Sequence, residues 1–154
     1  MSPGPATDAG VFARTFEGCV VELGVASGRV VGVSFPDDVP ADADSDHPLL
    51  DRIGAYLDGE ADQFDDVQVA LTVPTSHRSI LEAVRNVPHG ETVSVARIAR
   101  LAGLDDEDDD DLRTVEAALR ENPVPLFVPD HRVEGPGATP DEVVRLLRSV
   151  ESGS

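Results

Sequence analysis

The sequence predicts an α+β fold in which a small sheet comes first and helices follow. Short valine-rich segments alternate with glycine-containing turns before residue 36, a pattern typical of antiparallel strands. From residue 49 on, apolar residues recur at helical spacing between capping residues and prolines. We therefore expect a small N-terminal α/β sheet domain (residues 1–70) and a C-terminal domain (residues 71–154), a division that 154 residues allow.

The N-terminal elements follow from this pattern. Val11–Arg14, Gly18–Val25 and Gly28–Phe35 are expected to be strands, the last two forming a hairpin broken at Ala26-Ser27. The acidic, proline-bearing segment Pro36–Pro48 is expected to be a loop. Leu49–Leu57 carries apolar residues at helical spacing and predicts the first helix.

Three helices are expected in the next stretch. Ser76 is the predicted N-cap of a helix through Val84, and Ser94 that of a helix over Val95–Leu101, ended by Gly103. After an acidic connector, a third helix is predicted over Leu112–Glu121, stopped at Asn122-Pro123. The last two, short and joined by a turn, indicate a helix-turn-helix.

The C-terminal end combines a strand and a helix in our interpretation. Val124–Val128 is apolar throughout and predicts a buried strand. Thr139 is the expected N-cap of the last helix, with Pro140 at its first position and acids in its first turn.

The charge is strongly acidic and bears on possible partners. Thirty acidic residues stand against twelve basic ones, all arginine, for a net charge of −18. Such an excess of carboxylate ordinarily disfavours nucleic acid. Spread along the whole chain, however, it suits a protein kept soluble in concentrated salt, as in a halophile, where a Debye length of about 3 Å at ~1 M weakens distant repulsion. Net charge is thus a weak argument against DNA.

Several classes of site are not expected. The chain has no run of about 18 apolar residues that would span a membrane and no signal peptide at its N-terminus, so a cytoplasmic protein is expected. The single cysteine, Cys19, excludes an internal disulfide. The run Asp105–Asp111 lacks the alternation and glycine of an EF-hand, so we interpret it as a solvated loop and expect neither a metal ion nor another cofactor.

Three motifs carry a resemblance to a known family. They are Val87-Pro88-His89-Gly90-Glu91-Thr92-Val93-Ser94, the stretch Arg113–Pro123, and Pro129-Asp130-His131-Arg132. In this order and spacing they resemble the alkylguanine-DNA alkyltransferases, the methylated-DNA–protein-cysteine methyltransferases. A weaker likeness, in Tyr56-Leu57-Asp58-Gly59 and Phe64-Asp65, extends it toward the N-terminus. The resemblance implies a winged-helix-like C-terminal domain that bears the helix-turn-helix.

The resemblance also assigns site residues. The family reads Pro-Cys-His-Arg where this chain reads Pro-Asp-His-Arg, so Asp130 stands at the position of the reactive cysteine. His131 matches the histidine that activates the cysteine, and Glu151 matches the glutamate that orients this histidine through water. Asn122 matches an asparagine that bonds the backbone of the active-site turn. No catalytic residue is expected, because a carboxylate is a weak nucleophile and a thiolate a strong one.

Three roles remain open for Asp130. It could form a buried ion pair with His131 that keeps the turn folded. It could accept a hydrogen bond from an exocyclic amine of a base. In a third, hydrolytic role, Asp130 or His131 would activate water.

The DNA-facing residues are also implied by the resemblance. Arg113 matches the arginine finger that fills the gap left by a flipped base, although it could equally pair with the acidic connector. Thr114 and Glu116 replace small residues of the family, Val95 replaces a tyrosine, and Gly135–Ala138 is a shortened pocket loop. The remaining expected DNA contacts are Ala117, Arg132 and Ser94.

The first functional hypothesis is an alkyltransferase-like protein of DNA repair. It would bind double-stranded DNA with an alkylated base as a monomer, without methyl transfer, and signal to excision-repair proteins. The alternatives are an interaction or structural protein that kept the fold and lost DNA, which Glu116 favours, and an enzyme with altered chemistry at Asp130 and His131.

Overall fold

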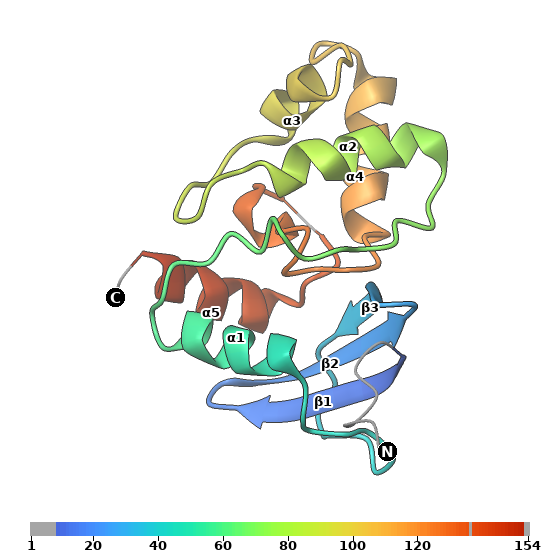
Figure 1. Cartoon of the computed structure of the whole chain (residues 1–154). Coiled ribbons are helices and arrows are strands. Elements are labelled where there is room, and N and C mark those ends of the chain that lie inside the picture. Colours follow the sequence, from blue (N-terminus) through green and yellow to red (C-terminus); the bar gives the residue numbers. More distant parts are fainter. Residues whose placement is uncertain (1–8, 136, 153–154) are drawn as a thin grey trace.

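An antiparallel sheet forms one end of the molecule (Figure 1). The computed structural model describes residues 9–135 and 137–152. Its strands β1 (Gly10–Phe16), β2 (Cys19–Ala26) and β3 (Arg29–Ser34) pair in the order β1-β2-β3, so both connections are hairpins. The register places Phe12 opposite Leu23 and Leu23 opposite Val33, and all three are buried on one face. The predicted strands and the α+β class are confirmed.

Helix α1 (Pro48–Leu57) packs against the sheet and confirms the first predicted helix. It begins at His47, whose Nδ1 accepts a hydrogen bond from the backbone N–H of Leu49 at 3.0 Å. Its apolar face, Leu50, Ile53 and Tyr56, is buried.

Helices α2 (Thr75–Arg85), α3 (Val95–Leu101) and α4 (Asp109–Arg120) pack together at the other end of the molecule (Figure 1). Ser94 caps α3 as predicted, accepting from the N–H of Arg97, but Ser76 is not a cap, because α2 begins after Pro74 with no side-chain cap. Helix α4 begins three residues before the predicted Leu112. The last four acids of the connector, Asp108–Asp111, therefore act as N-cap and first turn, where the helix dipole favours negative charge.

The segment after α4 differs from its prediction. Val124–Val128 is buried but is a turn, not a strand: the N–H of Val128 donates to the carbonyl of Val124, and Leu126 has a φ of 81°. A left-handed leucine is strained, and such strain persists only where the surroundings impose it. The turn delivers the chain into a short 3₁₀ helix, η1 (Asp130–Arg132).

Helix α5 (Asp141–Glu151) returns to lie beside α1 (Figure 1). Thr139 does not cap it, because Pro140 is the N-cap residue and the Thr139 side chain is buried against Asp130 instead. The prediction that Thr139 caps α5 was therefore wrong, because its hydroxyl donates to the carboxylate of Asp130.

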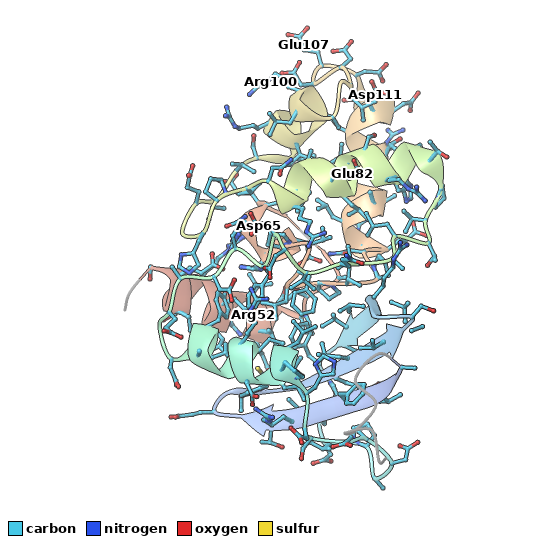
Figure 2. The ribbon with its side chains drawn as sticks, viewed as in Figure 1. Arg52, Asp65, Glu82, Arg100, Glu107 and Asp111 are labelled. Carbon is cyan, nitrogen blue, oxygen red and sulfur yellow. The ribbon has the colours of Figure 1, made fainter. Side chains whose placement is uncertain are left out.

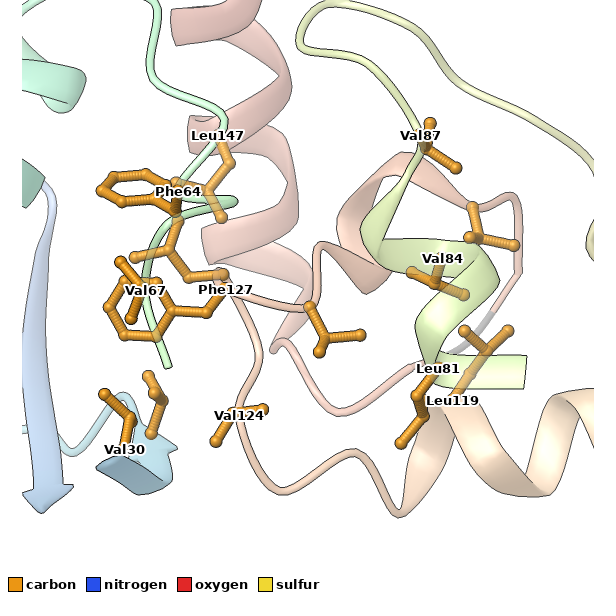
Figure 3. Close-up of a cluster of buried hydrophobic side chains, with 14 of the residues drawn as sticks. Val30, Phe64, Val67, Leu81, Val84, Val87, Leu119, Val124, Phe127 and Leu147 are labelled. Carbon is orange, nitrogen blue, oxygen red and sulfur yellow. The ribbon is translucent and has the colours of Figure 1, made fainter. Parts of the chain in front are cut away.

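The core runs without a break from the sheet to the helices. Figure 3 shows Val67 beside Phe64 and Phe127, with Val30 of β3 on one side of them and Leu147 on the other. One cluster of buried side chains continues from here to α2 and α4. The division at residue 70 and the helix-turn-helix stay predictions. No helix among residues 9–135 and 137–152 is long and apolar enough to cross a bilayer.

Candidate functional site

The site is built around a turn whose three polar residues are almost completely buried. Asp130, His131 and Arg132 are 3%, 1% and 2% exposed, respectively. Burying ionisable groups is costly unless each is hydrogen-bonded or paired. Their partners come from several parts of the chain that are far apart in sequence, so tertiary contacts fix the conformation of the turn.

Asp130 is held by three donors. Oδ2 accepts from Nδ2 of Asn122 at 3.1 Å and from the backbone N–H of Ala138 at 3.0 Å, and Oδ1 accepts from the hydroxyl of Thr139. Burial raises the pKa of the Asp130 carboxyl, and the three donors and nearby His131 only partly oppose this. Protonation of Asp130 is therefore easier than for an aspartate in water.

His131 turns toward the last helix. Its Nε2 lies 2.7 Å from Oε2 of Glu151, and both side chains are buried. This contact is direct, whereas the resemblance implied an intervening water. An ion pair between Asp130 and His131, one of the three roles left open for Asp130, is not formed, because each side chain has other partners. Nδ1 of His131 is buried and has no hydrogen-bond partner among the described residues.

Arg132 also binds Glu151, through two parallel bonds. Its Nε donates to Oε1 and its Nη2 to Oε2, each at 2.9 Å, while Nη1 reaches Gln63 and the carbonyl of Val87. A bidentate guanidinium–carboxylate pair is the strongest geometry of this kind. The prediction that Arg132 contacts DNA does not fit this burial.

Glu151 is consequently the centre of a network. Besides His131 and Arg132, it accepts from the hydroxyl of Tyr56 and, at 3.2 Å, from the backbone N–H of Gly90. Burial opposes its ionisation, but hydrogen bonds from His131 and Arg132 outweigh that and lower the pKa of the carboxyl well below its ordinary range. Burial and the neighbouring Glu151 in turn raise the pKa of Tyr56, so its hydroxyl stays a donor.

Asn122 ties the end of α4 to the turn. Its Nδ2 donates to the carbonyl of Val128 at 2.9 Å as well as to Asp130, and its Oδ1 accepts from the N–H of Val124. This is the backbone contact that the resemblance implied for it. Its amide also orients the Asp130 carboxylate, which the sequence did not indicate.

The residues expected to face DNA lie on α3, on α4 and just before α3. Arg113 is largely exposed and Nη1 lies 3.2 Å from Asp110, one turn earlier on α4. The Thr114 hydroxyl donates to the carbonyl of Asp110, and Ser94 is used as a cap. The other two expected contacts and the predicted obstacle are partly exposed: Val95, Ala117 and Glu116.

The acidic connector shares this end of the molecule. Figure 2 shows Glu107, Asp111 and Arg100 at the tip farthest from the sheet. Arg100 pairs with Asp106 at 2.7 Å, so this arginine and Arg113 each have an acidic partner. Among the described residues, no group of three or more histidine, cysteine, aspartate or glutamate side chains is arranged to hold a metal ion.

Four residues of the network were missed by sequence reasoning: Tyr56, Gln63, Thr139 and Arg148. The carbonyl of His131 accepts from Nε of Arg148 at 2.8 Å. The sequence indicates Tyr56 only through its resemblance to a linking segment and through a helical periodicity that buries it on the same face as Ile53.

The C-terminal part of the chain is similar to a known family of proteins. Residues 75–153 match the family model described as 6-O-methylguanine DNA methyltransferase, DNA binding domain. A methylated-DNA–protein-cysteine methyltransferase of Methanopyrus kandleri is 36% identical over 87 residues, covering 56% of this chain and 62% of that protein. A DNA base-flipping protein of Thermus thermophilus is 38% identical over 86 residues, covering 55% and 54%. The matches thus span little more than half the length of these curated relatives.

The overall fold is also similar to solved structures. The Mycobacterium tuberculosis O6-methylguanine methyltransferase superposes with a TM-score of 0.76 over 93% of this chain and 92% of that one, at 22% identity. The M. tuberculosis protein in complex with DNA gives the same values. At this identity the likeness establishes the fold alone.

Proposed function

This chain belongs to the 6-O-methylguanine DNA methyltransferase family, and from that premise we propose that it is an alkyltransferase-like protein of DNA repair. It binds double-stranded DNA and recognises an alkylated or flipped base without accepting the alkyl group. Its relatives include both methyltransferases and a DNA base-flipping protein, and the second of these supports base recognition as the function of this chain.

The observation that carries the proposal is the state of the turn. Asp130 occupies the position that matches the reactive cysteine, while the histidine–glutamate pair and the Asn122 contact surround it. A carboxylate held by three donors is a poorer nucleophile still, because each bond stabilises its negative charge. The same bonds disfavour a role for Asp130 in activating water. The scaffold supports recognition and not transfer.

The DNA-binding part of the proposal assigns roles to exposed residues. Arg113 serves as the finger that fills the gap left by the flipped base, and α3 and α4 form the helix-turn-helix. Ser94, Val95, Thr114 and Ala117 line the same face. Arg132 is reassigned to positioning Glu151. The acidic composition, with no lysine, supports an origin in a high-salt organism, where this face meets DNA under strong screening.

The decisive experiment combines binding and mass. The full chain is titrated against one duplex with and without O6-methylguanine, at high and moderate salt, and its mass is measured after prolonged incubation. We expect preference for the lesion-bearing duplex and an unchanged protein mass. A stable methyl adduct on the protein would overturn the claim that no transfer occurs, and equal affinity for both duplexes would overturn lesion recognition.

A second candidate function is an interaction protein that has lost DNA. The two ion pairs that occupy Arg100 and Arg113, together with Glu116 on the same helix as Arg113, favour it. This candidate predicts no measurable binding to either duplex at any salt concentration, whereas the first predicts binding that strengthens as salt is lowered.

A further inference from the structure

The carboxylate of Asp130 lies directly beneath a short segment of chain, Gly137–Thr139. Two of its three donors, the N–H of Ala138 and the hydroxyl of Thr139, belong to this segment. The third, Asn122, belongs to the end of α4. Asp130 therefore joins two parts of the chain that meet at the turn.

The contact with Gly137 is unusually close. A Cβ atom built on Gly137 would lie 3.0 Å from Cγ of Asp130, 3.2 Å from its Cβ and 3.3 Å from Oδ2. Carbon atoms in ordinary contact lie about 3.5–4.0 Å apart. The segment can rest on the carboxyl group only because residue 137 has no side chain, so the glycine and the aspartate are complementary.

The closed arrangement hides the position that matches the reactive cysteine. Asp130 is 3% exposed, and both of its oxygens already accept hydrogen bonds. A base cannot reach the carboxylate while Gly137–Thr139 lies over it. Entry of a base to this position therefore requires the segment to leave Asp130.

We propose that Asp130 is a positioning residue that anchors the segment Gly137–Thr139 over the candidate base site and so opposes entry of a flipped base. The anchor consists of the Ala138 and Thr139 hydrogen bonds and the fit of Gly137 against the carboxyl group. This inference rests on the proposed function for the identity of the ligand, but the anchor itself is a property of the free protein.

Three variants test the anchor. Asp130→Ala removes both hydrogen bonds to the segment. Asp130→Asn is the matched control: its amide oxygen can accept from Asn122 and Ala138, while its NH₂ donates to the Thr139 hydroxyl, which is able to accept. Gly137→Ala keeps the carboxylate but places a methyl group against it, and its backbone is not in the left-handed region that would strain alanine.

The readout is hydrogen exchange at the Ala138 amide in the free protein, with the paired β2 amide of Leu23 as the control for global stability. We expect about tenfold faster exchange or more in Asp130→Ala and Gly137→Ala, and little change in Asp130→Asn. In the double variant Asp130→Ala/Gly137→Ala the effect of the methyl group should be smaller, because Cγ and Oδ2 are removed and only Cβ of residue 130, 3.2 Å away, stays close to it. Equal effects of Gly137→Ala in both backgrounds would overturn the anchor. If Asp130→Ala does not fold, the test rests on Gly137→Ala, and an unchanged exchange rate at Ala138 in that variant would overturn the anchor.

The DNA arm separates the anchor from the proposed function. If the anchor opposes base entry, Gly137→Ala should raise the ratio of affinities for O6-methylguanine duplex over unmodified duplex several-fold, and Asp130→Asn should not. An unchanged ratio with faster Ala138 exchange would refute the role in base entry. If no variant binds either duplex, the proposed function fails, and the exchange measurements alone decide whether Asp130 anchors the segment.

Discussion

The guanidinium of Arg132 and the carboxylate of Glu151 form a bidentate pair with both side chains 3% exposed. The pair fastens the last residue of α5 to the turn that contains Asp130. Because Tyr56 of α1 binds the same carboxylate, one acidic side chain holds the N-terminal half, the turn and the last helix together. The residues matched to a catalytic relay therefore also have a structural task.

That task gives a stability prediction. Glu151→Gln should destabilise the fold by about 3–5 kcal/mol, because it leaves the buried Arg132 without its counter-charge. Tyr56→Phe removes one donor but no charge, and about 1 kcal/mol is expected for it. Urea unfolding of both variants in the same buffer measures the difference. Comparable losses in the two variants would mean that the charge pair contributes no more than an ordinary hydrogen bond.

Acid should act on Glu151 and Asp130 in opposite directions. Burial would raise the pKa of Glu151, but its hydrogen bonds to His131 and Arg132 outweigh burial and lower the pKa in the folded protein. The stability that Glu151 contributes is therefore present near neutral pH and is lost as pH falls toward the folded pKa. The pKa of Asp130 is raised by burial, so its folded form holds a proton more readily. Stability from this group is present at low pH and is lost as pH rises through the raised pKa.

The two variants separate these contributions. In the wild type, stability contributed by Asp130 is lost as pH rises above the ordinary aspartate range, and Asp130→Asn should remove this loss. The stability of the variant should therefore rise with pH more steeply than that of the wild type. Glu151→Gln should flatten the acid side of the profile. The free energy of unfolding, measured by urea at several pH values from acid to neutral, tests both slopes. A wild-type slope in Asp130→Asn would show that Asp130 does not titrate in the mildly acidic range.

Local signals in the sequence predicted much of the fold but little of the site's wiring. Ser94 and the apolar periodicity that follows it are enough to predict α3, because the cap and the helix are close together in sequence. Valine-rich stretches beside glycines predict the strands in the same way. Ser76 failed as a cap because α2 begins earlier, after Pro74. Thr139 failed because the partner of a hydroxyl depends on what tertiary packing brings near. For Thr139 that partner is Asp130, nine residues away.

The same limit applies to Arg132 and to Val124–Val128. An arginine beside a histidine in a loop-like motif reads as a surface residue unless its buried acidic partner, nineteen positions later, is known. An apolar run of five residues is compatible with a strand or a buried turn, and only the Asn122 contacts and the left-handed Leu126 decide between them. The family resemblance predicted which residues form the site, whereas their contacts depend on tertiary packing that the sequence pattern does not reveal.

Arg113 should matter more for a lesion than for DNA in general. If it fills the gap left by a flipped base, Arg113→Ala should weaken binding to the O6-methylguanine duplex roughly tenfold or more and binding to unmodified duplex much less. Arg145→Ala, on the exposed side of α5, is the matched control for loss of one positive charge. Equal losses on both duplexes would reduce Arg113 to a phosphate contact.

The charge of Glu116 provides the last prediction, because it decides how well α4 tolerates DNA. Glu116 follows Arg113 by three residues on α4, so the two side chains lie on neighbouring positions of the helix surface, and Glu116 is partly exposed. A carboxylate on a face that approaches phosphates lowers affinity, and screening weakens this penalty as salt rises. Glu116→Gln removes the charge and keeps the shape, so we expect about two- to fivefold tighter binding at low salt, in line with the roughly 1 kcal/mol or less that one surface charge contributes. The gain should shrink at high salt.

Glu142→Gln, an exposed acid in the first turn of α5, makes the same change of net charge elsewhere. Titration of both variants and the wild type against one duplex at two salt concentrations isolates position 116. An identical gain in the two variants would assign the effect to net charge and remove α4 from the DNA-facing surface. Absence of binding by all three proteins at both concentrations would reject DNA recognition and leave the interaction-protein candidate.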